Sequence, residues 1–124
     1  MILVDTSVWI KFFARKEPFA SHLRSLLLRE KVAGHELVYG ELLIGDLGGR
    51  SQFLADYQAM FHARSVSHTD VVTFVVNRGF HGLGVSWIDV HLLASATVDG
   101  IKLWTADLRL SELATTLGFS YEPF

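Results

Sequence analysis

Four acidic residues are the part of this sequence with the clearest chemical meaning. Each of them lies beside apolar residues that a folded chain would bury: Asp5, Glu41, Asp89 and Asp107. A carboxylate that faces a core is costly unless a cation pairs with it, and the neighbouring sequence offers no matching set of Lys or Arg residues. A divalent metal ion, which prefers several hard oxygen ligands, is the simplest common partner. We therefore interpret these residues as a metal site.

Helix capping is the alternative explanation for three of the four acids. Asp5, Asp89 and Asp107 each stand at or near the start of a predicted helix, where an acid can cap N–H groups and favour the helix dipole. Taken one at a time, each is explained better by a cap than by a metal ligand. Glu41 is different, because it is predicted inside a helix with apolar residues three and four positions away on the same side.

The elements that carry these acids are predicted from alternating apolar runs. Short runs at 1–4, 32–34, 101–104 and 119–121 indicate buried strands. Amphipathic or capped segments indicate helices at about 6–14, 18–28, 37–45, 52–61, 67–78, 88–98 and 108–117. Such alternation implies a parallel sheet with helices on both faces. Asp5 and Asp107 then lie at the carboxyl edge of the sheet, where ligand sites of α/β proteins form.

The composition limits the class of protein. The sequence of 124 residues, half of them hydrophobic and 19% charged, predicts one folded domain, 1–124. The absence of Cys excludes disulfides, iron–sulfur clusters and thiolate zinc sites. No apolar run is long enough to cross a bilayer, and Asp5 interrupts the N-terminal run too early for a signal peptide. These features predict a soluble cytoplasmic protein.

The net charge of −2 hides an uneven distribution. Residues 1–31 contain six basic and three acidic residues, whereas the rest of the chain contains five basic and ten acidic residues. A locally basic surface can attract a polyanion such as RNA, even on an acidic protein. An ordinary solvated helix face explains the same pattern equally well.

Four blocks of sequence, in this order, resemble the PIN-domain ribonucleases, and specifically the VapC-like toxins of toxin–antitoxin pairs. The blocks are Leu3–Ile10, Gly40–Gly45, Ile88–Ala96 and Leu103–Asp107, so the resemblance covers essentially the whole chain. It implies a three-layer α/β/α PIN-like fold with a central parallel sheet of four to five short strands. One departure is Ala106, where many relatives carry a basic residue, and this weakens the expectation of a phosphate contact there.

The resemblance also implies a function and a set of roles. The four acids would hold Mg²⁺ or Mn²⁺ as the catalytic residues of an endoribonuclease, with Asp5 and Asp89 as the strongest ligands. Glu41 would bind directly or through a water, and Asp107 would be the outer ligand. Thr105 would support the site from behind the ligands. The alternative is a PIN-like module that binds RNA or protein without cutting, and an intact set of acids argues against it.

Three other enzyme classes are excluded, each because one required residue is absent or misplaced. A haloacid-dehalogenase phosphatase needs a second Asp two positions after the first, where this chain has Ser7. A response-regulator receiver needs an Asp at the end of a central strand, whereas Asp56 lies in a predicted helix. A zincin motif starting at His35 lacks its second His, because Tyr39 occupies that position.

Apolar stripes on the first two helices suggest protein partners. Trp9, Phe12 and Phe13 form one stripe, and Leu23, Leu26 and Leu27 form the other. Both stripes are explained simply as core. VapC-like proteins, however, form homodimers and are inhibited by a cognate antitoxin. The resemblance therefore implies a homodimer and a groove near residues 9–28 for an antitoxin segment, with an antitoxin Arg or Lys reaching the acids.

Overall fold

The computed structural model describes residues 1–124 and alternates short strands with helices. The strands are β1 (Ile2–Val4), β2 (Val32–Ala33) and β3 (Lys102–Trp104). The helices are α1 (Thr6–Phe13), α2 (Phe19–Leu28), α3 (Glu36–Ile44), α4 (Ser51–Ala59), α5 (His68–Arg78), α6 (Trp87–Asp99) and α7 (Leu108–Thr116), with a 3-10 turn η1 (Asp46–Gly49) before α4. Every predicted helix is present, with its ends within two residues of the predicted ones.

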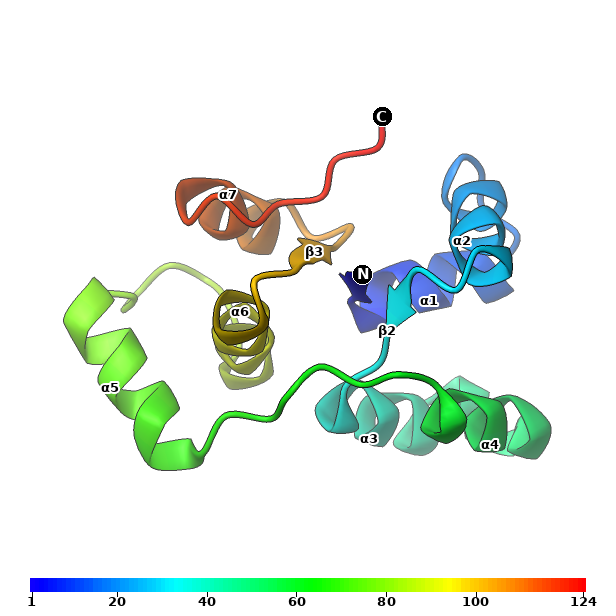
Figure 1. Cartoon of the computed structure of the whole chain (residues 1–124), viewed down its shortest axis with the longest axis horizontal. Helices are drawn as coiled ribbons and strands as arrows, with labels where there is room; N and C mark the ends of the chain where they lie inside the picture. The colour runs from blue at the N-terminus through cyan, green and yellow to red at the C-terminus, as the bar shows by residue number, and fades with distance from the viewer.

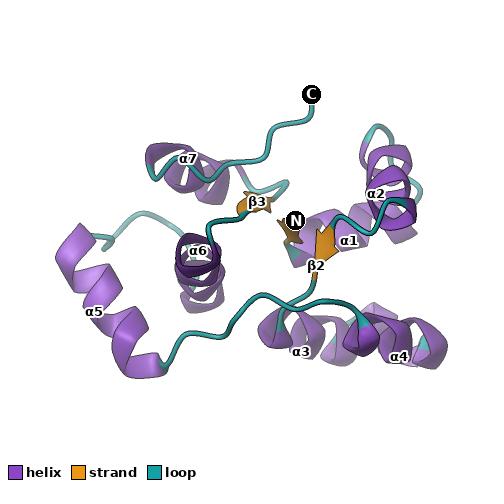
Figure 2. Ribbon diagram, in the orientation of Figure 1, coloured by secondary structure: helices purple, strands orange, loops and turns teal.

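The strands form a parallel sheet of three, in the order β2-β1-β3. Leu3 of the central strand lies opposite Ala33 on one side and Leu103 on the other. The strands are short and lie in the middle of the molecule, among helices (Figure 2). In Figure 1, α2 and α7 lie above the strands, α3 and α4 lie below them and α6 lies to their left, so the predicted layering of helices around a parallel sheet is confirmed.

The expectation of four to five strands was wrong. The predicted last strand, 119–121, forms only a single parallel bridge between Leu103 and Ser120, outside any regular strand. A second isolated bridge joins Gly34 to His62 on the opposite side of the sheet. Each segment meets the sheet at one residue, and a regular strand requires successive paired residues. The sheet therefore has three strands with one bridged segment beside each edge.

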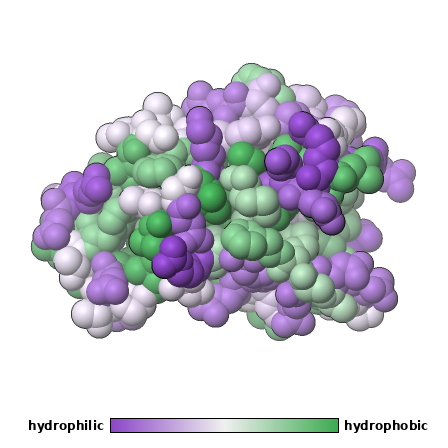
Figure 3. All heavy atoms as spheres, in the orientation of Figure 1, coloured by the Kyte–Doolittle hydropathy of each residue, from purple (hydrophilic) through white to green (hydrophobic).

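The burial of the strands on both faces explains why their sequences are continuous apolar runs. Leu3, Val4 and Leu103 are fully buried, because helices cover both faces of the sheet. A cluster of 19 buried residues joins the strands to the helices. The surface drawn in Figure 3 mixes polar and apolar side chains, and some apolar atoms show near its centre. No helix of the structure has the length and apolar character needed to span a membrane.

The aromatic and leucine stripes of the first two helices are mainly core. Trp9 is 1% exposed, and its ring centre lies 5.3 Å from that of Phe53 and 5.6 Å from that of Tyr57 in α4. Leu23 and Leu26 are buried as well. The interpretation of the stripes as core is therefore confirmed for these three residues, which cannot line an open groove.

Candidate active site

Two of the four acids follow neighbouring strands. Asp5 comes directly after β1, and its N–H donates to the carbonyl of Trp104 at 2.9 Å, which extends the pairing of β1 with β3 by one step. Asp107 follows β3 after a two-residue turn. Because parallel strands end at the same edge of a sheet, both acids lie at the carboxyl edge. Asp5 is buried and Asp107 is exposed.

A group of hydroxyls holds one oxygen of Asp5. Ser7 Oγ and Thr105 Oγ1 both donate to Asp5 Oδ2, at 2.7 and 2.8 Å. The same hydroxyl oxygens accept backbone N–H groups after β3: Ala106 donates to Ser7, and Asp107 donates to Thr105, both at 3.0 Å. Asp5 occupies the N-cap position of α1 but makes no capping hydrogen bond with its side chain. Capping therefore does not explain its carboxylate.

Glu41 projects from the middle of α3 towards the other acids. Thr6 Oγ1 donates to Glu41 Oε1 at 2.8 Å, which ties α3 to the start of α1. Burial raises the pKa of Glu41 above its ordinary value, and the negative charges of Asp5 and Asp89 raise this pKa further, while the bond from Thr6 opposes the shift. The three carboxylates are therefore within electrostatic reach of one another.

Asp89 caps its helix and also faces the acids. Its Oδ2 accepts the N–H of Ser86 at 2.9 Å, and its own N–H donates to Ser86 Oγ at 3.1 Å, which completes a capping box at the start of α6. Burial raises the pKa of Asp89, the bonds with Ser86 lower it, and the charges of Asp5 and Asp107 raise it. The cap thus fixes one oxygen beside a repulsive group of negative charges.

Asp107 has a capping role as well. Its Oδ1 accepts the N–H of Leu110 at 3.0 Å, at the start of α7. Capping and membership of the acidic group are therefore not exclusive alternatives for Asp89 and Asp107. In both residues the cap orients the side chain at a helix start that faces the carboxyl edge of the sheet.

The four carboxylates share one arrangement. In each of them one oxygen accepts the hydrogen bonds described above, and the other makes none: Asp5 Oδ1, Glu41 Oε2, Asp89 Oδ1 and Asp107 Oδ2. The only side-chain polar atom that is sealed from solvent without a partner is Trp9 Nε1, so the free carboxylate oxygens keep contact with solvent. The one ion pair of the protein, Arg64 with Asp99, involves none of them.

This donor set suits a divalent cation in its chemistry. Hard oxygens with mutual repulsion and no basic partner are the ligands that Mg²⁺ and Mn²⁺ prefer. No three Asp, Glu or His side chains converge closely enough, in the conformation of the structure, to hold an ion between them. The structure therefore supplies the donor chemistry for a divalent cation without a closely gathered set of ligands.

The four acids and Thr105 were predicted as site residues from the sequence, and the structure adds hydroxyls of Thr6 and Ser7 that contact two of these acids. Thr6 was not singled out as a site residue in the sequence, and Ser7 was used only to exclude a phosphatase, whereas the structure bonds Thr6 to Glu41 and Ser7 to Asp5. A run of two hydroxyl residues directly after a buried acid was the available signal. Thr6 lies 35 residues from Glu41 and Ser7 lies 98 residues from Thr105, so no local pattern identifies these two contacts.

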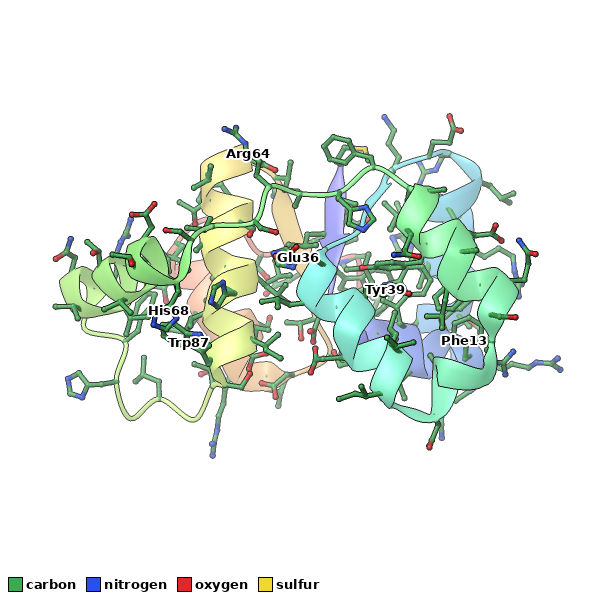
Figure 4. The ribbon with its side chains drawn as sticks, turned by 90° about the horizontal axis from the view of Figure 1, so that it is seen from below. Phe13, Glu36, Tyr39, Arg64, His68 and Trp87 are labelled. Carbon is green, nitrogen blue, oxygen red and sulfur yellow. The ribbon has the colours of Figure 1, made fainter.

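An open cavity of about 320 Å³ adjoins the acids on the side of Glu41. Its walls come from α1, α3, η1 and the start of α4: Thr6, Ile10, Phe13, Ala14, Glu41, Leu42, Gly45, Asp46, Leu47 and Arg50. The guanidinium of Arg50 lies 4.6 Å from the centre of the Phe13 ring, a cation–π distance. Phe13 is labelled in Figure 4 beside the ribbon of α4. The cavity thus combines an apolar wall, a basic group and one of the four acids.

Comparison with known proteins places this geometry in a family. Residues 2–115 match the model of the PIN domain. The chain is 35% identical over 119 residues to Ribonuclease VapC32 of Mycobacterium tuberculosis, in strains CDC 1551 / Oshkosh and H37Rv, which covers 95% of this chain and 94% of that protein. The fold is similar to the crystal structure of PAE2754 from Pyrobaculum aerophilum, with a TM-score of 0.57 and 20% identity over 94% of this chain and 88% of that one. The chain therefore belongs to the PIN-domain family, and its similarity over nearly the whole length places it among the VapC-like members.

Proposed function

We propose that this protein is a Mg²⁺- or Mn²⁺-dependent endoribonuclease and the toxin component of a toxin–antitoxin pair. The observation that carries the proposal is the group of four carboxylates at one edge of the sheet, each with a free oxygen and none with a basic partner. Membership of the PIN-domain family and similarity to a protein named as a ribonuclease support it.

In this proposal the acids have unequal roles. Asp5 and Asp89 are the main metal ligands, Glu41 binds directly or through a water, and Asp107 is the outer ligand. Ser7 and Thr105 donate to Asp5 Oδ2. These bonds orient the carboxylate and leave Oδ1 available to the ion. A bound divalent ion would activate a water for attack on the phosphodiester and neutralise charge on the phosphoryl oxygens.

RNA is the proposed substrate. The basic residues of segment 1–31 favour a polyanion, because Arg15, Lys16, Arg24, Arg29 and Lys31 are all exposed on or beside α1 and α2. Their side chains can attract the phosphate backbone towards a site whose own charge is negative before metal binds. The resemblance to VapC-like proteins points to single-stranded or loop RNA.

An antitoxin and a second copy of the chain are the proposed protein partners. The predicted groove over residues 9–28 is revised by the burial of Trp9, Leu23 and Leu26. The apolar surface that remains open on α1 includes Ile10, which is 55% exposed, and Phe13, and both line the cavity beside Glu41. We place the antitoxin segment there, where its Arg or Lys would reach the acids and compete with the metal ion.

A metal-dependent cleavage assay tests the enzymatic proposal directly. Structured RNAs are incubated with the purified protein and Mg²⁺ or Mn²⁺, with EDTA added in parallel reactions. We expect cleavage with either ion, none with EDTA, and recovery when Mn²⁺ is added in excess. Binding of RNA without cleavage under every ionic condition would instead establish the alternative, a non-catalytic PIN-like module.

A further inference from the structure

A buried imidazole joins three helices on the side of the molecule behind the acids. His35 precedes α3 as its N-cap and is fully buried. Its Nδ1 accepts the N–H of Leu37 at 3.0 Å, and its Nε2 lies 2.9 Å from Ser95 Oγ in α6. Its backbone N–H donates to the hydroxyl of Tyr57 in α4, at 2.9 Å.

The hydrogen bonds fix the form of the ring. Because Nδ1 accepts the bond from Leu37, the proton of the neutral imidazole lies on Nε2, and Nε2 donates to Ser95 Oγ. Burial lowers the pKa of His35 to about 4, so the neutral ring predominates at neutral pH. One side chain thus serves as an acceptor for α3 and a donor to α6 at the same time.

The positions of His35 and Ser95 relative to the acids are matched. His35 stands six residues before Glu41, and Ser95 stands six residues after Asp89. At a rise of about 1.5 Å per residue, each acid lies roughly 9 Å along its helix from the bond between His35 and Ser95. Glu41 follows His35 in the chain, whereas Asp89 precedes Ser95. Because the two acids are close enough to interact electrostatically, α3 and α6 are antiparallel between this bond and the site.

Apart from side chains that both helices contribute to the common core cluster, little connects α3 with α6. Helix α3 packs mainly on η1 and α4, and α6 packs mainly on α5 and β3. Figure 4 shows the two helices side by side, with Glu36 labelled at the start of α3 next to α6. The bond between His35 and Ser95 is the only hydrogen bond that links the segments 35–44 and 87–99. It is therefore the one directional contact between the two helices that carry Glu41 and Asp89.

We propose that His35 is a positioning residue, which acts through Ser95 to hold α3 and α6 at the separation that Glu41 and Asp89 need to share one metal ion. The inference rests on the proposed function, because it assigns a purpose to the spacing of two proposed ligands. His35 itself contacts neither carboxylate. Its effect on the site is transmitted by the two helices, which are rigid over the roughly 9 Å that separates the bond from the acids.

Two conservative substitutions test the proposal from both ends of the bond. His35→Asn keeps an N-cap acceptor for Leu37 but is too short to reach Ser95, and Ser95→Ala removes the acceptor on α6. We expect each variant to bind Mn²⁺ about tenfold more weakly in calorimetry, as for other residues that orient metal ligands. In RNA cleavage, kcat should fall while KM is unchanged. The double variant should be no weaker than either single variant, because one bond is lost in all three.

A destabilised variant remote from the bond separates positioning from general stability. Leu23→Ala empties part of the core at a fully buried position in α2. We expect it to lower the melting temperature and leave Mn²⁺ affinity unchanged. Equal weakening of Mn²⁺ binding in Leu23→Ala and His35→Asn would overturn the proposal, as would wild-type affinity in both folded variants of the bond. Failure of the wild-type protein to bind Mn²⁺ at all would instead reject the proposed function and the inference with it.

Discussion

The two walls of the acidic site are built by different means. The strand wall, with Asp5 and Asp107 after β1 and β3, is held by hydrogen bonds from Ser7 and Thr105 that connect the two chain segments. The helix wall, with Glu41 and Asp89, has fewer bonds per carboxylate and raised pKa values that arise from burial and repulsion. The first wall is stabilised without a metal ion, whereas the second carries an electrostatic cost that an ion would relieve.

This contrast separates two kinds of contribution from residues of the same type. A charge that accepts several hydrogen bonds is stabilised by the fold itself and stays in place when no ion is bound. A charge that is partly desolvated next to other negative charges reduces the stability of the metal-free protein. Substitutions in the two walls should therefore have different effects on stability, even where both weaken metal binding.

The largest effect is expected from Asp5→Asn. The amide oxygen can still accept the bonds from Ser7 and Thr105, so the fold should persist, but the charged ligand is lost. We expect Mn²⁺ affinity to fall by about 100-fold or more and RNA cleavage to be abolished, as measured by calorimetry and by gel assay. Asp56→Asn, at an exposed acid of α4, is the matched control and should behave as the wild type. Unchanged cleavage by Asp5→Asn would remove Asp5 from the site.

Removal of a single supporting hydroxyl should have an intermediate effect. Thr105→Val keeps the shape of the side chain but deletes its bond to Asp5 Oδ2, which leaves Ser7 to orient that carboxylate. A loss of roughly 10- to 100-fold in Mn²⁺ affinity or in cleavage rate is expected. The control is Thr115→Val in α7, where the hydroxyl bonds only to Ser111 and Glu122 on the surface. If both variants were equally active, the strand wall would not depend on its hydroxyl network.

Metal binding should stabilise the protein, and increasingly so as pH rises. Because Glu41 and Asp89 have raised pKa values in the folded state, their protonated forms favour folding at acidic pH. This contribution is lost as pH rises through the raised values, and Mn²⁺ then has ionised ligands to bind. At 100 times its Kd the ion would add about 2.7 kcal/mol to the free energy of unfolding.

Thermal melts with and without Mn²⁺ between pH 4.5 and 8 measure this linkage. The gain in melting temperature should be large at pH 8 and should fade towards pH 4.5, where protons compete for the carboxylates. The variant that combines Asp5→Asn with Asp89→Asn provides the control and should show no gain. A gain of wild-type size in this variant would place the bound ion elsewhere on the protein.

The smallest effect is expected for the stability of metal-free Glu41→Gln. Gln can still accept the bond from Thr6, and the substitution removes a carboxylate that burial and two neighbouring charges disfavour. The melting temperature without metal should therefore stay the same or rise by a few degrees at neutral pH, although Mn²⁺ binding weakens. Asp5→Asn should show no such rise. A clear fall for Glu41→Gln would mean that the helix wall is held by the charge of Glu41.

Local sequence patterns were sufficient for most of the secondary structure. The helix α6 illustrates this well, because Ser86 begins it with a capping box and Gly100, with a φ of 65°, ends it in the left-handed region that favours glycine. The strand at 119–121 shows where local patterns fail. Its residues are apolar enough for a strand, but only Ser120 pairs with β3. Pairing depends on the path of the chain after α7, which no local pattern encodes.

The spacing of the chain predicted four acids beside apolar segments, since helix periodicity and strand ends are properties of neighbouring residues. In the structure Asp5 is buried, whereas Asp107 is exposed. Tertiary structure added the contacts between distant residues, which periodicity does not describe. The bond from Thr105 to Asp5 spans 100 residues, and the bond between His35 and Ser95 spans 60. These contacts form only when strands and helices pack, because a hydroxyl or an imidazole has many potential partners in a chain and the fold selects one. The amino-acid types therefore predict the chemistry of the site, and the packing of the elements fixes how each carboxylate is held.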